Sequence, residues 1–198
     1  MLKKFIFITL FLATNILAQQ SNGERAAFGL NVNGDDLEVA GKISLATRTR
    51  NLRYRNFFID GNFISSQGNT LYGFGLYVEN SPIGYSHLKF GIGLRSIFSK
   101  IDQGDSYIAV PITVFARARM YIGGLPQSHV QVKFSYAPDP LSFSDASSYM
   151  EYRIEGDIQA IDNVEIYVGY RGIDTNYKRT EDDVEFNSAL YAGFRFVF

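Results

Sequence analysis

The alternation of apolar and polar residues constrains the fold of this chain more than any other feature. It recurs from about residue 26 to Phe198; around residue 90, for example, Leu88, Phe90 and Ile92 are separated by charged or small residues. A period of two is the pattern of a β-strand, because successive side chains of a strand point to opposite faces. No segment shows a convincing period of 3.6 residues, so we expect an all-β protein.

Ten segments carry this alternation. They cover residues 26–33, 36–47, 52–64, 70–79, 87–97, 106–121, 129–136, 147–160, 163–171 and 184–198. Many of them have the roughly 9–11 residues that a tilted strand needs to cross a bilayer. We therefore predict a transmembrane antiparallel up-and-down β-barrel of about ten strands, with eight strands as the alternative. Pro111 lies inside the sixth segment and has no N–H to donate, so we expect a bulge or an irregular pairing there.

The connections between these segments fit a barrel with both termini in the periplasm. Single-chain outer-membrane barrels have even strand numbers, short periplasmic turns and longer external loops. The connections near 48–51 and 161–162 are tight, whereas those near 137–146 and 172–183 are long and polar. Because successive connections alternate between the two sides of the membrane, the long ones fall on the external side. The sequence Asn33-Gly34-Asp35 is typical of a tight hairpin, so the first external loop should be short.

The N-terminus has the three parts of a secretory signal peptide. Two lysines precede the almost purely apolar segment 5–13, and Ala18 supplies a small residue for cleavage. We therefore predict a signal peptide at 1–18 and an outer-membrane barrel domain at 19–198. An N-terminal membrane anchor is the alternative, but the apolar segment is shorter than the roughly 20 residues of a spanning helix.

The last eight residues alternate apolar or aromatic side chains with Gly and Arg. This pattern resembles the C-terminal signal by which the bacterial outer-membrane assembly machinery recognises β-barrels. The residues of this chain that match the signal are Tyr191, Gly193 and the aromatic residues Phe196 and Phe198. The resemblance implies that the protein lies in the cell outer membrane, with lipid and the barrel assembly machinery as partners.

If the apolar set faces lipid, the alternate set faces the lumen. We predict that the lumen is lined by Lys89, Arg95, Arg117, Arg119, Glu151, Arg153, Glu155, Asp157 and Arg171. A Lys or Arg that faced lipid at the midplane would cost roughly 2–4 kcal/mol, whereas charges of both signs can pair inside a barrel. A barrel of eight strands is just filled by its own side chains. The lumen is therefore either plugged by a salt-bridge network or a narrow polar pore.

These two states of the lumen correspond to two functions. The first is a porin-like protein that passes small polar solutes or ions. The second is a closed structural or surface-interaction barrel that acts through its external loops. In the loop 137–146, Leu141 and Phe143 would either fold back over the mouth as a lid or lie at the membrane interface. A soluble periplasmic β-sheet protein is the alternative to any barrel.

The sequence offers few residues for other chemistry. It has no cysteine, which excludes disulfides and thiolate chemistry, and a formal net charge of −1, which provides no basic patch for nucleic acid. His87 and His129 each follow a serine, and serine and histidine are the residue types of a catalytic Ser-His pair. Adjacent strand residues point to opposite faces, however, so neither pair can act together, and we expect two histidines at the membrane interface. No P-loop, dinucleotide fingerprint or zinc spacing occurs. We predict no catalytic residue, no metal, no cofactor and no enzymatic activity, and no feature points to an oligomeric state.

The segment from Tyr136 to Arg153, which contains Ala137-Pro138-Asp139-Pro140-Leu141-Ser142-Phe143, resembles the signature region of the YfaZ family. Val168-Gly169-Tyr170-Arg171 resembles it too, and Phe57, Ile59, Asp60 and Gly61 are compatible with it. YfaZ-like proteins are small exported outer-membrane proteins, expected to be β-barrels and often described as porin-like. The resemblance covers the mature chain and implies an outer-membrane barrel. It brings no catalytic residues.

Overall fold

A computed structural model of the protein describes residues 26–46, 56–100, 106–121, 123–124, 126–177 and 183–198. The predicted signal peptide at 1–18 and the predicted tight turn near 48–51 lie outside these residues. Among the described residues there is no helix with the length and apolarity of a membrane span.

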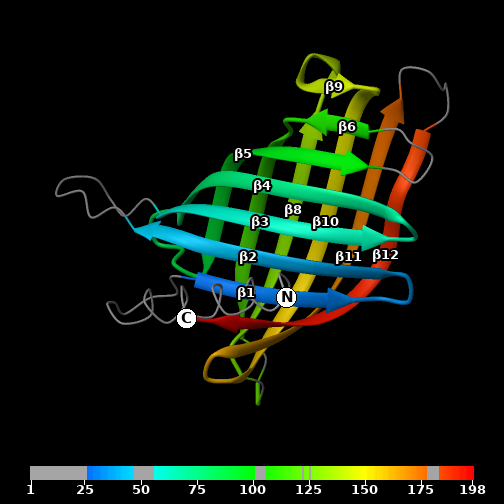
Figure 1. The fold of residues 1–198 in the computed structure, drawn as a ribbon. Helices are drawn as coiled ribbons and strands as arrows, with labels where there is room; N and C mark the ends of the chain where they lie inside the picture. Colours follow the sequence, from blue (N-terminus) through cyan, green and yellow to red (C-terminus); the bar gives the residue numbers. More distant parts are fainter. Residues whose placement is uncertain (1–25, 47–55, 101–105, 122, 125, 178–182) are drawn as a thin grey trace.

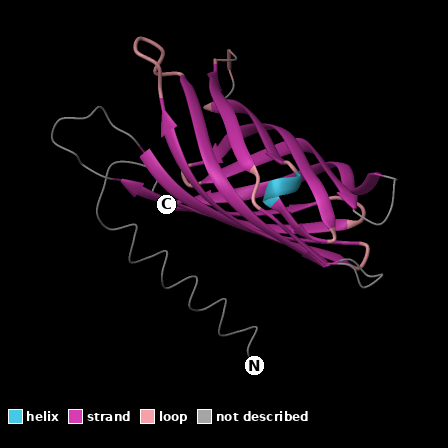
Figure 2. Cartoon of the chain, turned by 90° about the horizontal axis from the view of Figure 1, so that it is seen from above, coloured by secondary structure: helices cyan, strands magenta, loops and turns pink. Residues whose placement is uncertain are grey.

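The described chain is strand almost throughout (Figure 1). Its strands are β1 (Ala26–Val32), β2 (Asp36–Ala46), β3 (Asn56–Ser66), β4 (Asn69–Asn80), β5 (Leu88–Lys100), β6 (Ser106–Ala109), β7 (Ile112–Met120), β8 (Ser128–Ala137), β9 (Ser142–Ser144), β10 (Ala146–Ile161), β11 (Val164–Tyr177) and β12 (Asp183–Val197). One short 3-10 helix, η2 (Asp139–Leu141), follows β8 and is coloured cyan in Figure 2.

Ten of these strands close into an antiparallel barrel, which confirms the predicted fold. Neighbours in the sequence pair in turn from β1 to β5, and then through β7, β8, β10, β11 and β12. The ring closes where β1 pairs with β12, as in Phe28 opposite Phe196. Ala26 and Phe198 exchange two backbone hydrogen bonds, so both ends of the described chain lie at one end of the barrel. We call this the terminal end and the opposite one the far end.

The sixth predicted strand is broken at Val110 and Pro111, as expected for a proline without an N–H. The part before the break, β6, continues along β5 but pairs with the short strand β9 on its other side. The part after the break, β7, pairs with β5 and β8. The carbonyl of Pro111 still accepts a hydrogen bond from the N–H of Arg95, at 3.1 Å.

The predicted difference in loop lengths is only partly correct. The β1–β2 turn is tight, and the side-chain oxygen of Asn33 accepts hydrogen bonds from two N–H groups within it. However, most of the predicted long loop 172–183 is strand, because β11 runs to Tyr177 and β12 begins at Asp183. The two faces of β11 change character in this part, because Ile173, Thr175 and Tyr177 are buried inside whereas Asp174 and Asn176 lie on the outer face. Without an apolar outer face this part of the strand resembles a polar loop in the sequence.

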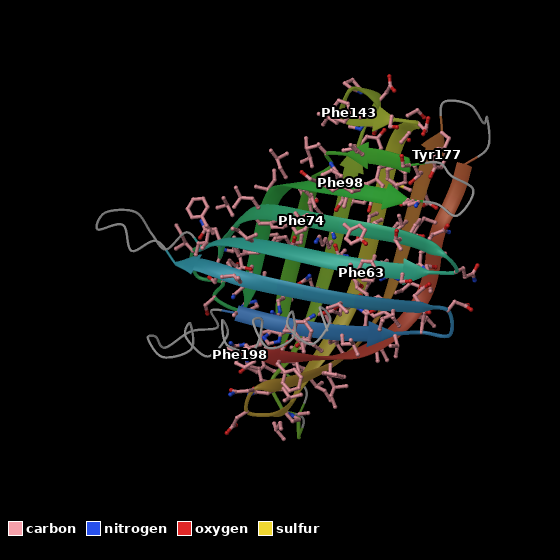
Figure 3. The ribbon with its side chains drawn as sticks, viewed as in Figure 1. Phe63, Phe74, Phe98, Phe143, Tyr177 and Phe198 are labelled. Carbon is pink, nitrogen blue, oxygen red and sulfur yellow. The ribbon has the colours of Figure 1, made fainter. Side chains whose placement is uncertain are left out.

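The barrel has an apolar outer face, and charged side chains lie inside it. Phe74 and Leu76 on β4, Ile92 and Leu94 on β5, and Val168 on β11 are exposed large side chains of the outer face, and every long strand contributes residues of this kind. Figure 3 shows such side chains around the ribbon, with Phe74 and Phe98 labelled. The charged side chains at alternate positions, such as Glu38, Arg95 and Arg171, are buried.

Interior aromatic rings lie over glycines of the barrel wall. A Cβ added to Gly91 would come within 2.1 Å of the Phe115 ring, and one added to Gly93 would lie 2.3 Å from the carbonyl oxygen of Leu76 and 2.4 Å from the Tyr77 ring. Since real Cβ atoms do not approach this closely, these positions require glycine to admit the rings.

Replacing Gly93 by alanine is therefore expected to lower the free energy of unfolding by about 1–3 kcal/mol, because the wall cannot move away from the new methyl group. Urea unfolding followed by circular dichroism measures the change. Gly156→Ala is the matched control, since nothing lies within 4 Å of a Cβ at that strand position. Equal unfolding midpoints for the two variants would contradict the requirement for glycine at position 93.

Candidate functional site

Glu38 is the centre of a first ion-pair cluster in the barrel interior. Its carboxylate accepts hydrogen bonds from Arg171 at 2.7 Å and from both terminal nitrogens of Arg153, at 2.8 and 2.9 Å. The amides of Asn31 and Asn62 donate to it as well. Alternation along β2, β10 and β11 aims these side chains inward, and closure of the barrel brings the three strands together.

Glu151 extends this cluster toward β5. It accepts hydrogen bonds from Arg95 at 2.5 Å, from Arg153 at 2.7 Å and from the hydroxyl of Tyr149 at 2.9 Å. Nearby, Lys133 pairs with Asp60 at 3.2 Å. The ammonium and guanidinium groups thus each have a carboxylate partner, which is the condition for burying charges of both signs.

A second ion-pair cluster lies nearer the terminal end. Arg117 contacts Asp157 at 3.1 Å and Glu165 at 3.4 Å, and Arg195 pairs with Glu165 at 2.9 Å and with Glu155. Lys89 forms a separate and more exposed pair with Glu79, at 3.1 Å.

His129 belongs to the second cluster, although the sequence suggested an interfacial histidine. Its Nδ1 lies 2.8 Å from Asp157 and 3.1 Å from the guanidinium of Arg117. The alternation of β8 carried a signal that was missed. His129 lies four residues before the inward Lys133, so both side chains point to the same face of the strand. His129, Asp157 and Glu165 could together hold a metal ion, since one ligand atom of each lies within 4.8 Å of the others. In the structure the Arg117 guanidinium contacts all three.

An apolar cluster fills the interior toward the far end, and we call it the apolar plug. Its buried residues are Ile64, Leu71, Ile97, Tyr107, Ala109, Ala137, Ala146, Tyr149, Ile173, Tyr177 and Phe186. They come from β3 to β6, β8, and β10 to β12. Leu141 packs against the plug, so this half of the predicted lid folds back over the mouth, whereas Phe143 on β9 is 47% exposed.

A cavity of about 160 Å³ lies on the terminal side of the plug, and we call it the vestibule. Its wall reaches Ala27 and Val197 at the terminal end of the barrel. Its aromatic wall residues are Phe58, Tyr77, Phe115 and Tyr167. Its charged wall residues are Glu38, Asp60, Glu155, Glu165, Lys42, Arg95, Arg117, Lys133, Arg153 and Arg195.

The structure brings most of the residues predicted for the lumen into these clusters. Arg95, Glu151, Arg153 and Arg171 meet in the first, and Arg117, Glu155 and Asp157 in the second. Lys89 lies apart with Glu79, and Arg119 is exposed near the terminal end of β7. The aromatic wall of the vestibule was not predicted, although the alternation carried the signal, since Tyr77 follows the outward Leu76 on β4 and therefore points inward.

The residues predicted as the assembly signal lie at the end of β12. Tyr191 points inward and donates to Glu155 at 3.2 Å. Gly193 lies close to β1, where an added Cβ would be 2.4 Å from the carbonyl oxygen of Leu30. Phe196 is exposed on the outer face, and the N–H of Phe198 donates to Ala26.

A comparison with curated proteins gives no match. The family model described as "YfaZ precursor" matches residues 9–198, which is nearly the whole sequence. The chain therefore belongs to the YfaZ family.

Proposed function

We propose that this protein is an outer-membrane β-barrel whose lumen is closed, and that it serves as a structural or surface-interaction barrel rather than as an open pore. The observation that carries the proposal is the filled interior. The apolar plug and the first ion-pair cluster leave side chains such as Ile97, Tyr149, Glu151 and Arg171 at most 2% exposed. The proposal assigns the protein no catalytic activity.

The outer face supports the membrane location. Its large apolar side chains form a surface far more extensive than the isolated patches of soluble proteins. Barrels of the outer membrane have this arrangement, with an apolar band outside and polar residues inside. The match to a precursor family is consistent with export. Lipid and the barrel assembly machinery are the partners that this location implies.

Porin-like passage of small polar solutes is the second candidate. The vestibule favours it, because a cavity with charged walls already lies in the lumen on the terminal side of the plug. Passage would require the apolar plug to move, since a side-chain constriction of this kind blocks ions by excluding water.

Single-channel conductance in a planar bilayer tests the two candidates. We expect the refolded protein to be silent, because the plug excludes water. The double variant Ile97→Ala, Tyr107→Ala removes side chains from the plug and is expected to give discrete conductance steps. Phe143→Ala is the matched control, since this residue lies at the same end but outside the plug.

Folding of each variant is checked first by circular dichroism and by heat-modifiable migration in gels. Discrete steps from the unaltered protein would overturn the closed-lumen proposal. If those steps changed in Arg117→Ala or Glu155→Ala, they would favour porin-like passage along the vestibule.

A further inference from the structure

We propose that the vestibule is a binding site for a small organic carboxylate with a flat apolar body, the size of one aromatic ring. The inference goes beyond the proposed function, because it concerns a ligand that enters from the terminal end. It does not depend on whether the far end is closed.

The vestibule has an aromatic wall that can hold such a body. Phe58 stacks on Tyr77 with ring centroids 4.9 Å apart, and Phe115 meets both rings edge-on at 5.6 and 6.1 Å. These three side chains form a buried cluster of their own, separate from the apolar plug. Aromatic rings prefer offset or edge-on contacts with a further ring, so the cluster can accept a flat ligand.

Two ammonium groups lie over the same aromatic wall. The Nζ atom of Lys42 is 4.1 Å from the centroid of Phe58, and that of Lys133 is 5.1 Å from the centroid of Tyr77. They come from β2 and β8, which are not neighbours in the sheet. A carboxylate bound beside the rings would therefore have an ammonium group on each side, that of Lys133 being shared with Asp60.

Hydrogen-bond donors without a partner also belong to this wall. Within the described part of the chain, the buried polar atoms that lack a partner include the Tyr77 hydroxyl, Arg95 Nε and Arg117 Nε. Tyr77 and Arg95 are only 1% and 2% exposed, and all three residues line the vestibule. Asp60 Oδ1 is the one acceptor of this kind in the wall. These atoms are themselves buried, so their side chains must turn toward the cavity to meet an acceptor of the ligand, which would then stabilise them.

The charged side chains that line the vestibule also favour an anionic ligand. Six cationic side chains line the vestibule against four carboxylates, which are Glu38, Asp60, Glu155 and Glu165. The other carboxylates of the two clusters, Glu151 and Asp157, are not among the lining residues. The surface that a ligand would touch is therefore more positive than the interior as a whole.

The size of the vestibule limits the ligand. An apolar cavity of about 150 Å³ is known to hold benzene, and the vestibule measures about 160 Å³. A single ring with one carboxylate fits this volume once an arginine or lysine side chain moves slightly. The wall of the vestibule reaches Ala27 and Val197, so the ligand enters from the terminal end.

Benzoate is the probe for this site, and benzyl alcohol is its uncharged counterpart. Each is titrated into the refolded full-length protein in non-ionic detergent, with empty micelles as the blank, and binding is followed by calorimetry. We expect saturable binding of benzoate that is at least about tenfold tighter than that of benzyl alcohol, which is the worth of one charge-assisted hydrogen bond.

Lys42→Met tests the site within the protein. We expect it to weaken benzoate binding about tenfold, whereas Lys100→Met should leave the affinity unchanged, because Lys100 is exposed at the far end of β5. Folded protein that shows no saturable binding would refute the proposal. So would equal affinities for benzoate and benzyl alcohol, or equal losses in the two lysine variants. The conductance experiment tests the closed lumen without any ligand, whereas calorimetry tests the binding of benzoate. Failure of one proposal can therefore be distinguished from failure of the other.

Discussion

Replacing Arg171 by methionine is expected to lower the free energy of unfolding by about 3–5 kcal/mol. The Arg171 side chain is fully buried and donates to Glu38 at 2.7 Å, to Asp36 at 3.2 Å and to Asn187 at 2.9 Å. Methionine fills a similar volume but leaves the Asp36 and Glu38 carboxylates without this partner. Uncompensated buried charge is what makes the loss of one partner costly. Urea unfolding in lipid vesicles measures the change.

Two further variants separate charge from packing. Lys89→Met removes a cation whose side chain is 42% exposed, so solvent screens the loss and the expected change is below about 1 kcal/mol. In the double variant Arg171→Met, Asp36→Asn the stranded charge of Asp36 is gone, so part of the lost stability should return. If Arg171→Met and Lys89→Met had equal effects, the first ion-pair cluster would not stabilise the barrel.

Replacing Val168 by arginine is expected to destabilise the barrel in a bilayer by roughly 2–4 kcal/mol. Val168 is 62% exposed in the apolar part of the outer face of β11, next to the exposed Ile166 on that face. If this face lies against hydrocarbon, as we propose, the guanidinium must be buried in lipid or drawn toward the interface. The measurement is the unfolding free energy in vesicles, compared with that in detergent.

Asn176→Arg is the matched control on the same strand. Asn176 is exposed on the outer face near the far end of β11, where an arginine should cost no more than about 1 kcal/mol. A neutral Val168→Arg in vesicles would contradict the membrane location and favour the soluble alternative.

The sequence determined the strands and the two faces of the sheet. A side-chain period of two is a local property of the backbone, so it places Leu88, Phe90 and Ile92 on one face without any knowledge of the fold. The effect of Pro111 is also local, because the missing N–H breaks the ladder in any barrel. The same alternation does not reveal a strand whose outer face is polar. Beyond Gly172 the outer face of β11 carries Asp174 and Asn176 while Ile173 is buried inside, and this change concealed the last part of the strand.

Only the tertiary structure decided how the interior is filled. Glu38 meets Arg153 and Arg171 across 115 and 133 residues of sequence, and these pairings depend on the strand order and register of the closed ring. The packing of the inward aromatic rings also depended on the neighbouring strands. Tyr77 and Phe115 can enter because Gly93 and Gly91 leave room on neighbouring strands, which no single strand reveals. Alternation is set by the geometry of a single strand. The ion pairs, the apolar plug and the vestibule form only when ten strands close into a barrel.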